Sequence, residues 1–386
     1  MENNIKEIIN DVYVARNFTS KKICGGISAV TVNAGSEAAA KGQKIKSKRI
    51  APPTITKEIV PSMTVPTPPA LDVETDEMEL KYEVSASMAE LGEEELSLKN
   101  SGHNELTLRQ GFIAEAIKSI VTIIEEQVGE VVAKGACQAI GTPGINPFAT
   151  DMKLLNRANT ILLNNGAGED TGTRSCVINP TTFENLANQD QNQDVSKSGS
   201  NVLIERGLVS SRFGMFIKKS AGIYEHTKGT ATGFDLNGSP SIGDTTVNVD
   251  GSNSGTILPG DLISWGGGEN KYVVNSASAS GASSGNIIFN NPGLVTDLTD
   301  TTEGVIQNNY FGNYVLERSA VELAIRPYMV PKKGDAALFH IETVDQETGL
   351  AFTLSSYKGY LMNRLEIKAI YGIKVWRPEW VVSLIA

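Results

Sequence analysis

The sequence predicts an α+β protein, and three stretches of the chain carry that prediction. Residues 105–140 place apolar side chains at three- and four-residue spacing, the pattern of a long amphipathic helix. Residues 79–88 alternate polar and apolar side chains, the pattern of a strand with one face in water. Residues 225–309 hold 14 of the 37 glycines among short apolar runs, which indicates a small all-β unit between mixed flanks.

Composition narrows the class of protein. The 386 residues are 40% hydrophobic, which is enough for a core and suits two or three domains. The three cysteines are few and far apart, as expected of reduced thiols in a cytoplasmic setting. A net charge of −10 argues against nucleic-acid binding as the main activity. With no signal-peptide pattern and no apolar run of about 18 residues, we expect a soluble protein without a membrane partner.

The first 18 residues predict a short amphipathic helix. Four apolar side chains form one stripe (Ile5, Ile8, Ile9 and Val12), and three acidic side chains lie off it (Glu2, Glu7 and Asp11). A helix this short is marginal alone and needs a partner surface. Two interpretations stay open, because the helix can pack on its own body or dock as an arm on a neighbouring chain.

Charge is strongly segregated over residues 41–95. Residues 41–58 carry a net +5, a proline-rich stretch follows, and residues 72–95 carry ten acidic residues against one lysine. Since proline excludes both helix and central strand, we expect an extended β-hairpin with oppositely charged legs. Its lysines can pair across the hairpin with Glu79 and Glu83, or reach an acidic surface of the next subunit. The second interpretation gives the candidate inter-subunit contacts Lys44, Lys46, Lys48, Arg49, Glu93, Glu94 and Glu95.

The long helix has a plausible N-cap at Asn104, and Gly141 with Pro143 predicts its end. It would run roughly 50 Å. Glu125 and Glu126 are adjacent and so point about 100° apart, which favours a solvated face over a pair of catalytic carboxylates. Residues 151–224 read as mixed helix and strand, with Asn179-Pro180 opening a helix. Strands are predicted at 175–178, 214–217, 245–249, 262–265, 271–274, 286–289, 367–371, 373–376 and 381–385.

No motif predicts a catalytic, cofactor or metal site. Ser355 and Lys358 fit the S-x-x-K pattern of serine acyl enzymes, but no K-T-G or S-D-N companion is present. The three histidines are scattered and lie at no metal-ligand spacing. Asp297, Asp300 and Glu303 do not follow a calcium-loop spacing, so a solvated acidic loop is the better interpretation. We therefore expect a protein that acts through its contacts and is not an enzyme.

The order of these parts resembles the major capsid (coat) protein of tailed double-stranded DNA bacteriophages, in the podovirus branch whose Hong Kong 97-like fold carries an inserted β domain. The hairpin from Gly42 to Met88, with Thr67-Pro68-Pro69 at its turn, is similar to that fold's extended loop. Residues 104–140 are placed like its spine helix. Further likeness lies at 214–217 and 223–227 before the insertion, at 309–311, 318–320 and Pro327 after it, and in the closing residues 372–379.

The resemblance implies a division of the chain into an N-terminal arm (1–34), an extended loop (35–89), a peripheral domain with the spine helix (90–150), a first axial part (151–224), the inserted β domain (225–309) and a returning axial and peripheral part (310–386). It also implies a capsid protein of the virion, assembled in the host bacterial cytoplasm into hexamers and pentamers of an icosahedral shell. The implied partners are other copies of the chain, a scaffolding protein, a portal protein and packaged double-stranded DNA, which is contacted without sequence specificity. The scaffold-contact candidates are Glu2, Glu7 and Asp11.

Two alternatives remain. A non-viral shell protein of the encapsulin type would share the fold. A serine acyl enzyme or a carbohydrate-binding protein would rest on Ser355 with Lys358, or on the glycine-rich β unit.

Overall fold

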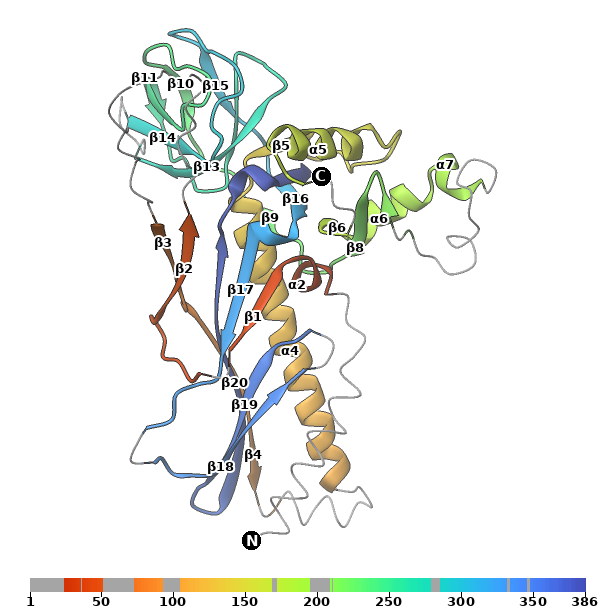
Figure 1. Cartoon of the computed structure of the whole chain (residues 1–386), viewed down its shortest axis with the longest axis vertical. Helices are drawn as coiled ribbons and strands as arrows, with labels where there is room; N and C mark the ends of the chain where they lie inside the picture. The colour runs from red at the N-terminus through yellow and green to blue at the C-terminus, as the bar shows by residue number, and fades with distance from the viewer. Residues whose placement is uncertain are drawn as a thin grey trace, which may run out of the picture.

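The computed structural model describes residues 24–35, 37–50, 73–91, 93, 105–168, 172–194, 209, 211–278, 285–331, 334–345 and 348–386. The amphipathic segment 1–18, the proline-rich tip 52–69 and Asn104 lie outside these residues. Figure 1 shows an elongated molecule in which one long helix runs beside a sheet, with a β-barrel at one end.

The long helix α4 (Glu105–Lys134) packs one face on a six-stranded sheet. Ile113, Ile117, Ile120 and Ile124 on the helix are at most 3% exposed, so the predicted apolar stripe is the buried one. The sheet consists of β1 (Thr31–Ala34), β4 (Tyr82–Leu91), β17 (Val321–Arg326), β18 (Ala337–Val344), β19 (Ala351–Lys358) and β20 (Met362–Val375).

Helix α4 ends six residues before the predicted end at residue 140. Residues 138–141 instead form β5 (Gln138–Gly141), which runs parallel to β21 (Val381–Ile385). The backbone N–H of Cys137 already donates to the carbonyl of Val381 at 2.9 Å. Pairing with a strand from the far end of the chain therefore replaces the last turns that the local pattern predicted.

The 14-residue strand β20 organises the six-stranded sheet. Its residues 363–368 pair with β19 and its residues 370–375 pair with β17, while β4 pairs along the opposite edge at 362–371. The predicted strands 367–371 and 373–376 are thus one continuous element. The alternation predicted for residues 79–88 is confirmed from Tyr82 to Met88 and continues to Leu91, with every second side chain of β4 exposed.

The charged hairpin is built from β2 (Lys44–Ile50) and β3 (Val73–Glu79), which pair antiparallel. The prediction that residues 79–88 form its returning leg is wrong beyond Glu79, because β4 belongs to the larger sheet. The chain crosses from one sheet to the other at Leu80, which is fully buried. It passes so close over β20 that a Cβ on Gly372 would lie 2.4 Å from the carbonyl oxygen of Glu79, so only glycine fits there.

A second sheet carries the middle of the chain, in the order β5, β21, β16 (Tyr310–Glu317), β6 (Arg174–Ile178), β8 (Met215–Lys219) and β7 (Ser211–Arg212), with β9 (Glu225–His226) beside β16. Helices α5 (Lys153–Asn164), α6 (Pro180–Ala187) and α7 (Asp190–Gln193) accompany it. Asn179 caps α6 as predicted, since its side-chain oxygen accepts the N–H of Thr182 at 2.7 Å. Short helix α2 (Gly25–Ala29) and the turns η1 (Arg318–Ala320) and η2 (Pro378–Trp380) complete the body.

The inserted stretch forms a closed barrel of six strands with its own aromatic core. Each strand pairs with two neighbours in a ring in which β12 returns to β13, and β13 also pairs with β5, so the barrel is continuous with the second sheet. The core contains Phe234, Trp265, Tyr272 and Phe289. Four of the strands were predicted, and β10 and β15 were not. The strands are β10 (Thr232–Leu236), β11 (Thr246–Ser254), β12 (Leu262–Trp265), β13 (Lys271–Ala277), β14 (Gly285–Phe289) and β15 (Glu303–Ile306).

Among the described residues, no helix combines the length and apolar character needed to cross a bilayer. The described part of the chain also contains no cluster of three side chains suited to a metal ion.

Candidate functional site

The charged hairpin places its basic and acidic legs in direct opposition. Lys44 lies opposite Glu79 and Lys46 opposite Glu77 in the strand register. The Glu77 carboxylate forms ion pairs with both lysines, at 2.7 Å from Nζ of Lys44 and 3.4 Å from Nζ of Lys46. The hydrogen bond from Lys44 lowers the pKa of Glu77 and raises that of Lys44. Pairing across the hairpin therefore occurs, with Glu77 as the acceptor in place of the predicted Glu79.

The predicted partner Glu83 is also engaged within the chain, but by Lys41, whose Nζ lies 3.7 Å from the Glu83 carboxylate. Lys48 lies opposite Thr75 and Arg49 opposite Glu74 in the backbone register. Glu93 is exposed. The candidates Glu94, Glu95, Glu2, Glu7 and Asp11 lie outside the described residues, so contacts between subunits through these residues stay a prediction.

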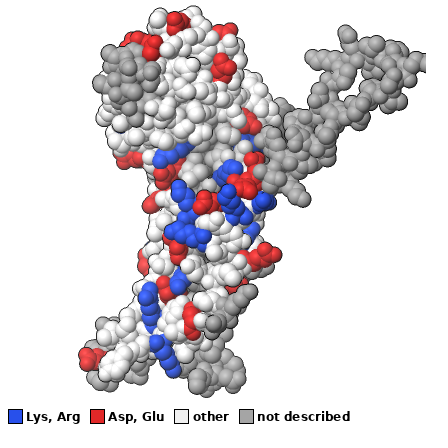
Figure 2. Space-filling view, turned by 90° about the vertical axis from the view of Figure 1, so that its left-hand side faces the viewer, with Lys and Arg blue, Asp and Glu red and all other residues white. Residues whose placement is uncertain are grey.

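Figure 2 shows that lysine and arginine side chains gather with acidic ones along the middle of the face that carries the hairpin. The barrel end of this face has few charges in view, and most of those are acidic. This agrees with the inserted stretch, which holds nine acidic residues and only Lys228 and Lys271 as bases. The net charge of −10 is thus the sum of a mixed body and an acidic barrel.

An apolar tip projects from the turn between β19 and β20. Tyr360 is 91% exposed and Leu361 77% exposed. Met362 and its strand partner Leu91 lie beside them at 41% and 42%. Leu361 has a φ of +55°, a left-handed conformation that costs a branched side chain of order 1 kcal/mol. We call Leu91, Tyr360, Leu361 and Met362 the apolar tip, and no sequence pattern predicted it.

A buried carboxylate anchors the first described residues to the long helix. Glu125, which is predicted from the helical spacing to lie on a solvated face, is 2% exposed, so that prediction is wrong. Its oxygens accept the backbone N–H groups of Gly26 at 2.6 Å and Ile27 at 2.8 Å, and the hydroxyl of Ser220 at 2.5 Å. A Cβ on Gly26 would lie 2.9 Å from Glu125 Oε1, so glycine permits the approach. Burial raises the pKa of Glu125 despite these three donors.

A second buried carboxylate holds the base of the barrel. Asp261 is fully buried and lies 2.8 Å from Nε2 of His226. It also accepts the backbone N–H groups of Gly229 at 2.9 Å and Leu258 at 2.7 Å. The ring of His226 packs against Tyr310, whose hydroxyl donates to the carbonyl of Gly260. Both chain crossings into the barrel are therefore fixed by one polar cluster.

Ser355, the candidate nucleophile, sits inside the six-stranded sheet. It is 1% exposed, and Lys358, three residues along the same strand, points to the other face. The hydroxyl of Ser355 lies 2.8 Å from Nδ1 of His340, and Nε2 of His340 lies 3.2 Å from Asp335. The order of groups is that of a serine triad, but a substrate cannot reach a serine at this depth. The contacts instead join β18 to β19.

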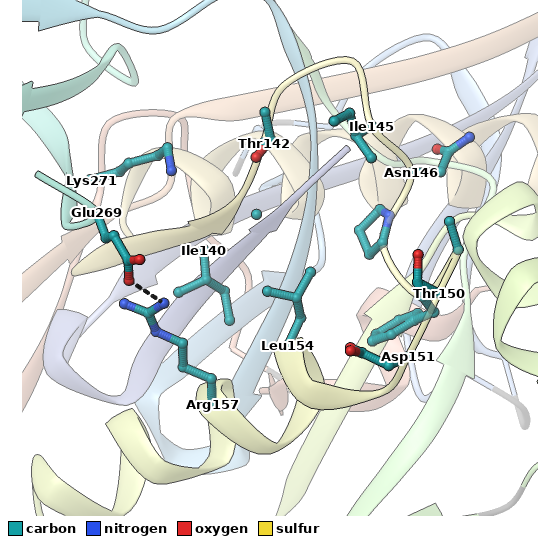
Figure 3. Close-up of a pocket in the computed structure, with 14 residues that line it drawn as sticks. Ile140, Thr142, Ile145, Asn146, Thr150, Asp151, Leu154, Arg157, Glu269 and Lys271 are labelled. Atoms are coloured by element: carbon teal, nitrogen blue, oxygen red, sulfur yellow. Dashed lines mark hydrogen bonds and ion pairs between the residues drawn. The ribbon is translucent and has the colours of Figure 1, made fainter. Parts of the chain in front are cut away.

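Figure 3 shows a pocket where the barrel meets the body, beside helix α5. It has a volume of about 340 Å³. Ile140 and Leu154 supply apolar walls, and the chain from Thr142 to Asp151 borders one side. Glu269 and Lys271 come from the barrel, and Arg157 from α5 binds Glu269 at 3.2 Å. The sequence offered no signal for this pocket, because its walls come from segments more than 100 residues apart.

Comparison with solved structures identifies the fold. The chain matches a chain of the capsid structure of Cyanophage P-SCSP1u with a TM-score of 0.50 and 14% identity, over 92% of this chain and 86% of that one. It also matches a chain of Mycobacterium phage Che8 (TM-score 0.47, 11% identity, 95% and 89% covered) and a virus-like particle from Pyrococcus furiosus (0.40, 9%, 98% and 98%). No protein-family model and no curated protein matches the sequence. The first match carries the assignment, and the predicted Hong Kong 97-like capsid fold is confirmed.

Proposed function

We propose that this chain is the major capsid protein of a tailed bacteriophage, which assembles with copies of itself into the icosahedral shell of the virion. The observation that carries the proposal is the capsid fold, which extends over 92% of the chain. At such low identity the fold alone does not specify function, so the surface must support it.

The apolar tip supports self-association. Its four side chains form a contiguous exposed apolar group, with Tyr360 at 91% and Leu361 at 77%, and contiguous apolar surface is typical of an interaction site. Leu361 is held in a strained conformation, which natural proteins keep mainly at functional positions. Covering the tip with another copy would remove this apolar surface from water.

The charge distribution suits a container for DNA. An acidic chain with a net charge of −10 does not hold phosphates strongly, so packaged double-stranded DNA stays mobile against the wall. The partners that belong to this proposal are a scaffolding protein, a portal protein and the packaged DNA. The domain division given above and the contact roles of Lys44, Lys46, Lys48, Arg49, Glu93, Glu94 and Glu95 belong to it as well, and so does the absence of catalytic activity.

Expression of the full chain, with and without a scaffolding protein from the same genome, tests the proposal. Size exclusion and negative-stain microscopy should show capsomers, closed shells or tubes. A chain that stays monomeric under both conditions would refute it. Charge reversal at Glu2, Glu7 and Asp11 should weaken scaffold-dependent assembly only, and unchanged assembly kinetics would mean that the first helix packs on its own body.

An encapsulin-like shell protein is the second candidate. A phage capsid gene should lie beside genes for portal, terminase and scaffold, and its particles should package DNA. A shell that forms without scaffold and encloses a protein cargo would favour the second candidate.

A further inference from the structure

The pocket between barrel and body contains a cation that lacks a partner among the residues that the structure describes. The ammonium of Lys271 makes no hydrogen bond or ion pair with any residue the structure describes, although it is half-buried. The neighbouring carboxylate, Glu269, is engaged by Arg157. The other acidic residue of the lining, Asp151, binds Lys153 at 2.8 Å. Both carboxylates of the pocket are therefore taken by other cations.

The surroundings make this lysine costly in the isolated chain. Burial lowers the pKa of Lys271, and the nearby guanidinium of Arg157 lowers it further, against an opposing effect of Glu269. A partly desolvated ammonium beside a second cation is stabilised when a carboxylate arrives. The charges of the lining balance in number, but both of its carboxylates are paired with Lys153 and Arg157, so Lys271 is the lining cation without a carboxylate at ion-pair distance among the described residues.

The remaining walls define what else the ligand presents. Ile140 and Leu154 form an apolar floor, and Ile145 stands at the rim with 60% of its surface exposed. Figure 3 shows the amine of Lys271 and the Arg157–Glu269 pair on one side, with the segment carrying Ile145 on the other. A volume of about 340 Å³ is at the small end of ligand pockets, which run from roughly 300 to 1,000 Å³. It suits a short piece of chain with a carboxylate next to an apolar side chain.

We propose that this pocket receives an acidic side chain of a second copy of this chain, which pairs with Lys271 while an adjacent apolar side chain covers Ile145 and Leu154. Two observations favour a second copy. The chain is rich in carboxylates, with 44 acidic residues against 34 basic ones, so an identical copy offers the required group. A head-to-tail ring of identical subunits also needs a receiving surface that differs from the surface presented to it. The inference rests on the proposed function, because it assigns a contact to the assembled state.

Carbodiimide cross-linking of assembled particles tests the inference directly. Particles are formed from an equal mixture of ¹⁴N- and ¹⁵N-labelled full-length chains, treated with a water-soluble carbodiimide, and digested for mass spectrometry. The reagent joins an amine to a carboxylate only when the two are in contact. We expect mixed-isotope peptides in which Lys271 is bonded to an acidic residue of another copy. Assembled particles in which Lys271 is linked only within its own chain, only to scaffold, or not at all would overturn the inference while leaving the proposed function intact.

Substitution gives a second readout. Lys271→Met removes the charge and keeps the aliphatic stem, so the free chain should melt at the same or a higher temperature, because the uncompensated cation is gone. The concentration required for assembly should rise about tenfold, and Lys271→Arg should restore most of it. Lys228→Met removes the only other lysine of the barrel and is the matched control, with assembly unchanged. Equal assembly of Lys271→Met and wild type would refute the inference, and failure of the wild-type chain to assemble would refute the proposed function with it.

Discussion

The carboxylate of Glu125 lies 2.6 Å from the amide nitrogen of Gly26, a residue 99 positions earlier in the chain. The same carboxylate accepts the N–H of Ile27 and the hydroxyl of Ser220, so one side chain of the long helix fixes two other segments. Glu125→Ala leaves these donors without an acceptor and should lower the free energy of unfolding by roughly 3 kcal/mol. Urea denaturation of the purified chain measures the loss, and a change under about 0.5 kcal/mol would contradict it.

Glu125 also makes stability depend on pH. Its pKa is raised in the folded chain, so the folded state binds the proton more tightly than the unfolded state. Its stabilising contribution is complete below the ordinary glutamate pKa of about 4.3 and is lost as the pH rises through the raised value. Stability of the wild type relative to Glu125→Gln, which cannot titrate, should therefore fall from pH 4 to pH 7. A constant difference across this range would show that the pKa is not raised.

A charge swap distinguishes pairing within the hairpin from pairing between subunits. Lys44→Glu and Glu77→Lys should each impair folding or assembly, whereas the double variant restores the 44–77 pair across the same hairpin. Because Lys46 then faces a lysine at position 77 and residue 44 faces Glu79 with like charge, the recovery should be partial. Assembly better than that of either single variant would assign the pair to one subunit. If the double variant assembles no better than the single ones although its free chain is as stable as wild type, these charges have partners on a neighbouring copy.

A substitution at Leu361 tests whether the apolar tip contributes to assembly or to the stability of the folded chain. Asparagine tolerates the left-handed backbone, so Leu361→Asn should leave the unfolding free energy unchanged or raise it by up to about 1 kcal/mol. Assembly should require a several-fold higher concentration, because an apolar contact is lost. Ile242→Asn, at a position 62% exposed on the barrel, is the control for a general effect of surface polarity. Light scattering of both variants against wild type provides the comparison.

Asp261 should be the main determinant of how firmly the barrel is held. Asp261→Ala strands the side chain of His226 and two backbone N–H groups in a buried site, for a loss of roughly 3–5 kcal/mol. Asp261→Asn keeps an acceptor and should cost less than half as much. Limited proteolysis of the alanine variant should cut near residues 226–230 and 256–261 before the rest of the chain. Cleavage at the wild-type rate and sites would argue against this anchoring.

Ser355 should behave as a structural residue. A fluorophosphonate probe should not label the folded chain, because the hydroxyl is 1% exposed. Ser355→Ala removes the partner of His340 and should cost about 1–2 kcal/mol in urea denaturation. Stoichiometric labelling that disappears in Ser355→Ala would instead restore the acyl-enzyme alternative.

Sequence patterns predicted elements whose signals are local. The stripe from Ile113 to Ile124 identified the long helix, and Asn179 with Pro180 marked the start of α6. Strand β5 escaped prediction, since its pairing with β21 spans more than 240 residues and overrides a helical pattern. The pairing partner of β4 was predicted wrongly for the same reason, because an alternating pattern does not show which strand will lie beside it.

The contact surfaces were harder to predict than the elements. Glu125 looks like any exposed helix glutamate until residues from 99 positions earlier and 95 positions later are brought to it. Tyr360, Leu361 and Met362 form a short apolar run, which in sequence is indistinguishable from a buried one. The pocket at Lys271 depends on the docking of the barrel against α5, a tertiary relationship without a local signal. The charged hairpin could be predicted from the sequence because its charged residues alternate along the strands.

The barrel also makes the chain modular. Its six strands close on themselves and enclose their own core, and the chain enters and leaves through His226 and Tyr310, which face each other as strand partners. A unit with adjacent ends can be exchanged for another without stretching the remaining chain, provided that the replacement also covers the body surface on which Leu262 and Val273 pack and which β13 joins by pairing with β5. Residues 226 and 310 are therefore natural graft points, where a foreign domain of similar end spacing could be carried once per subunit.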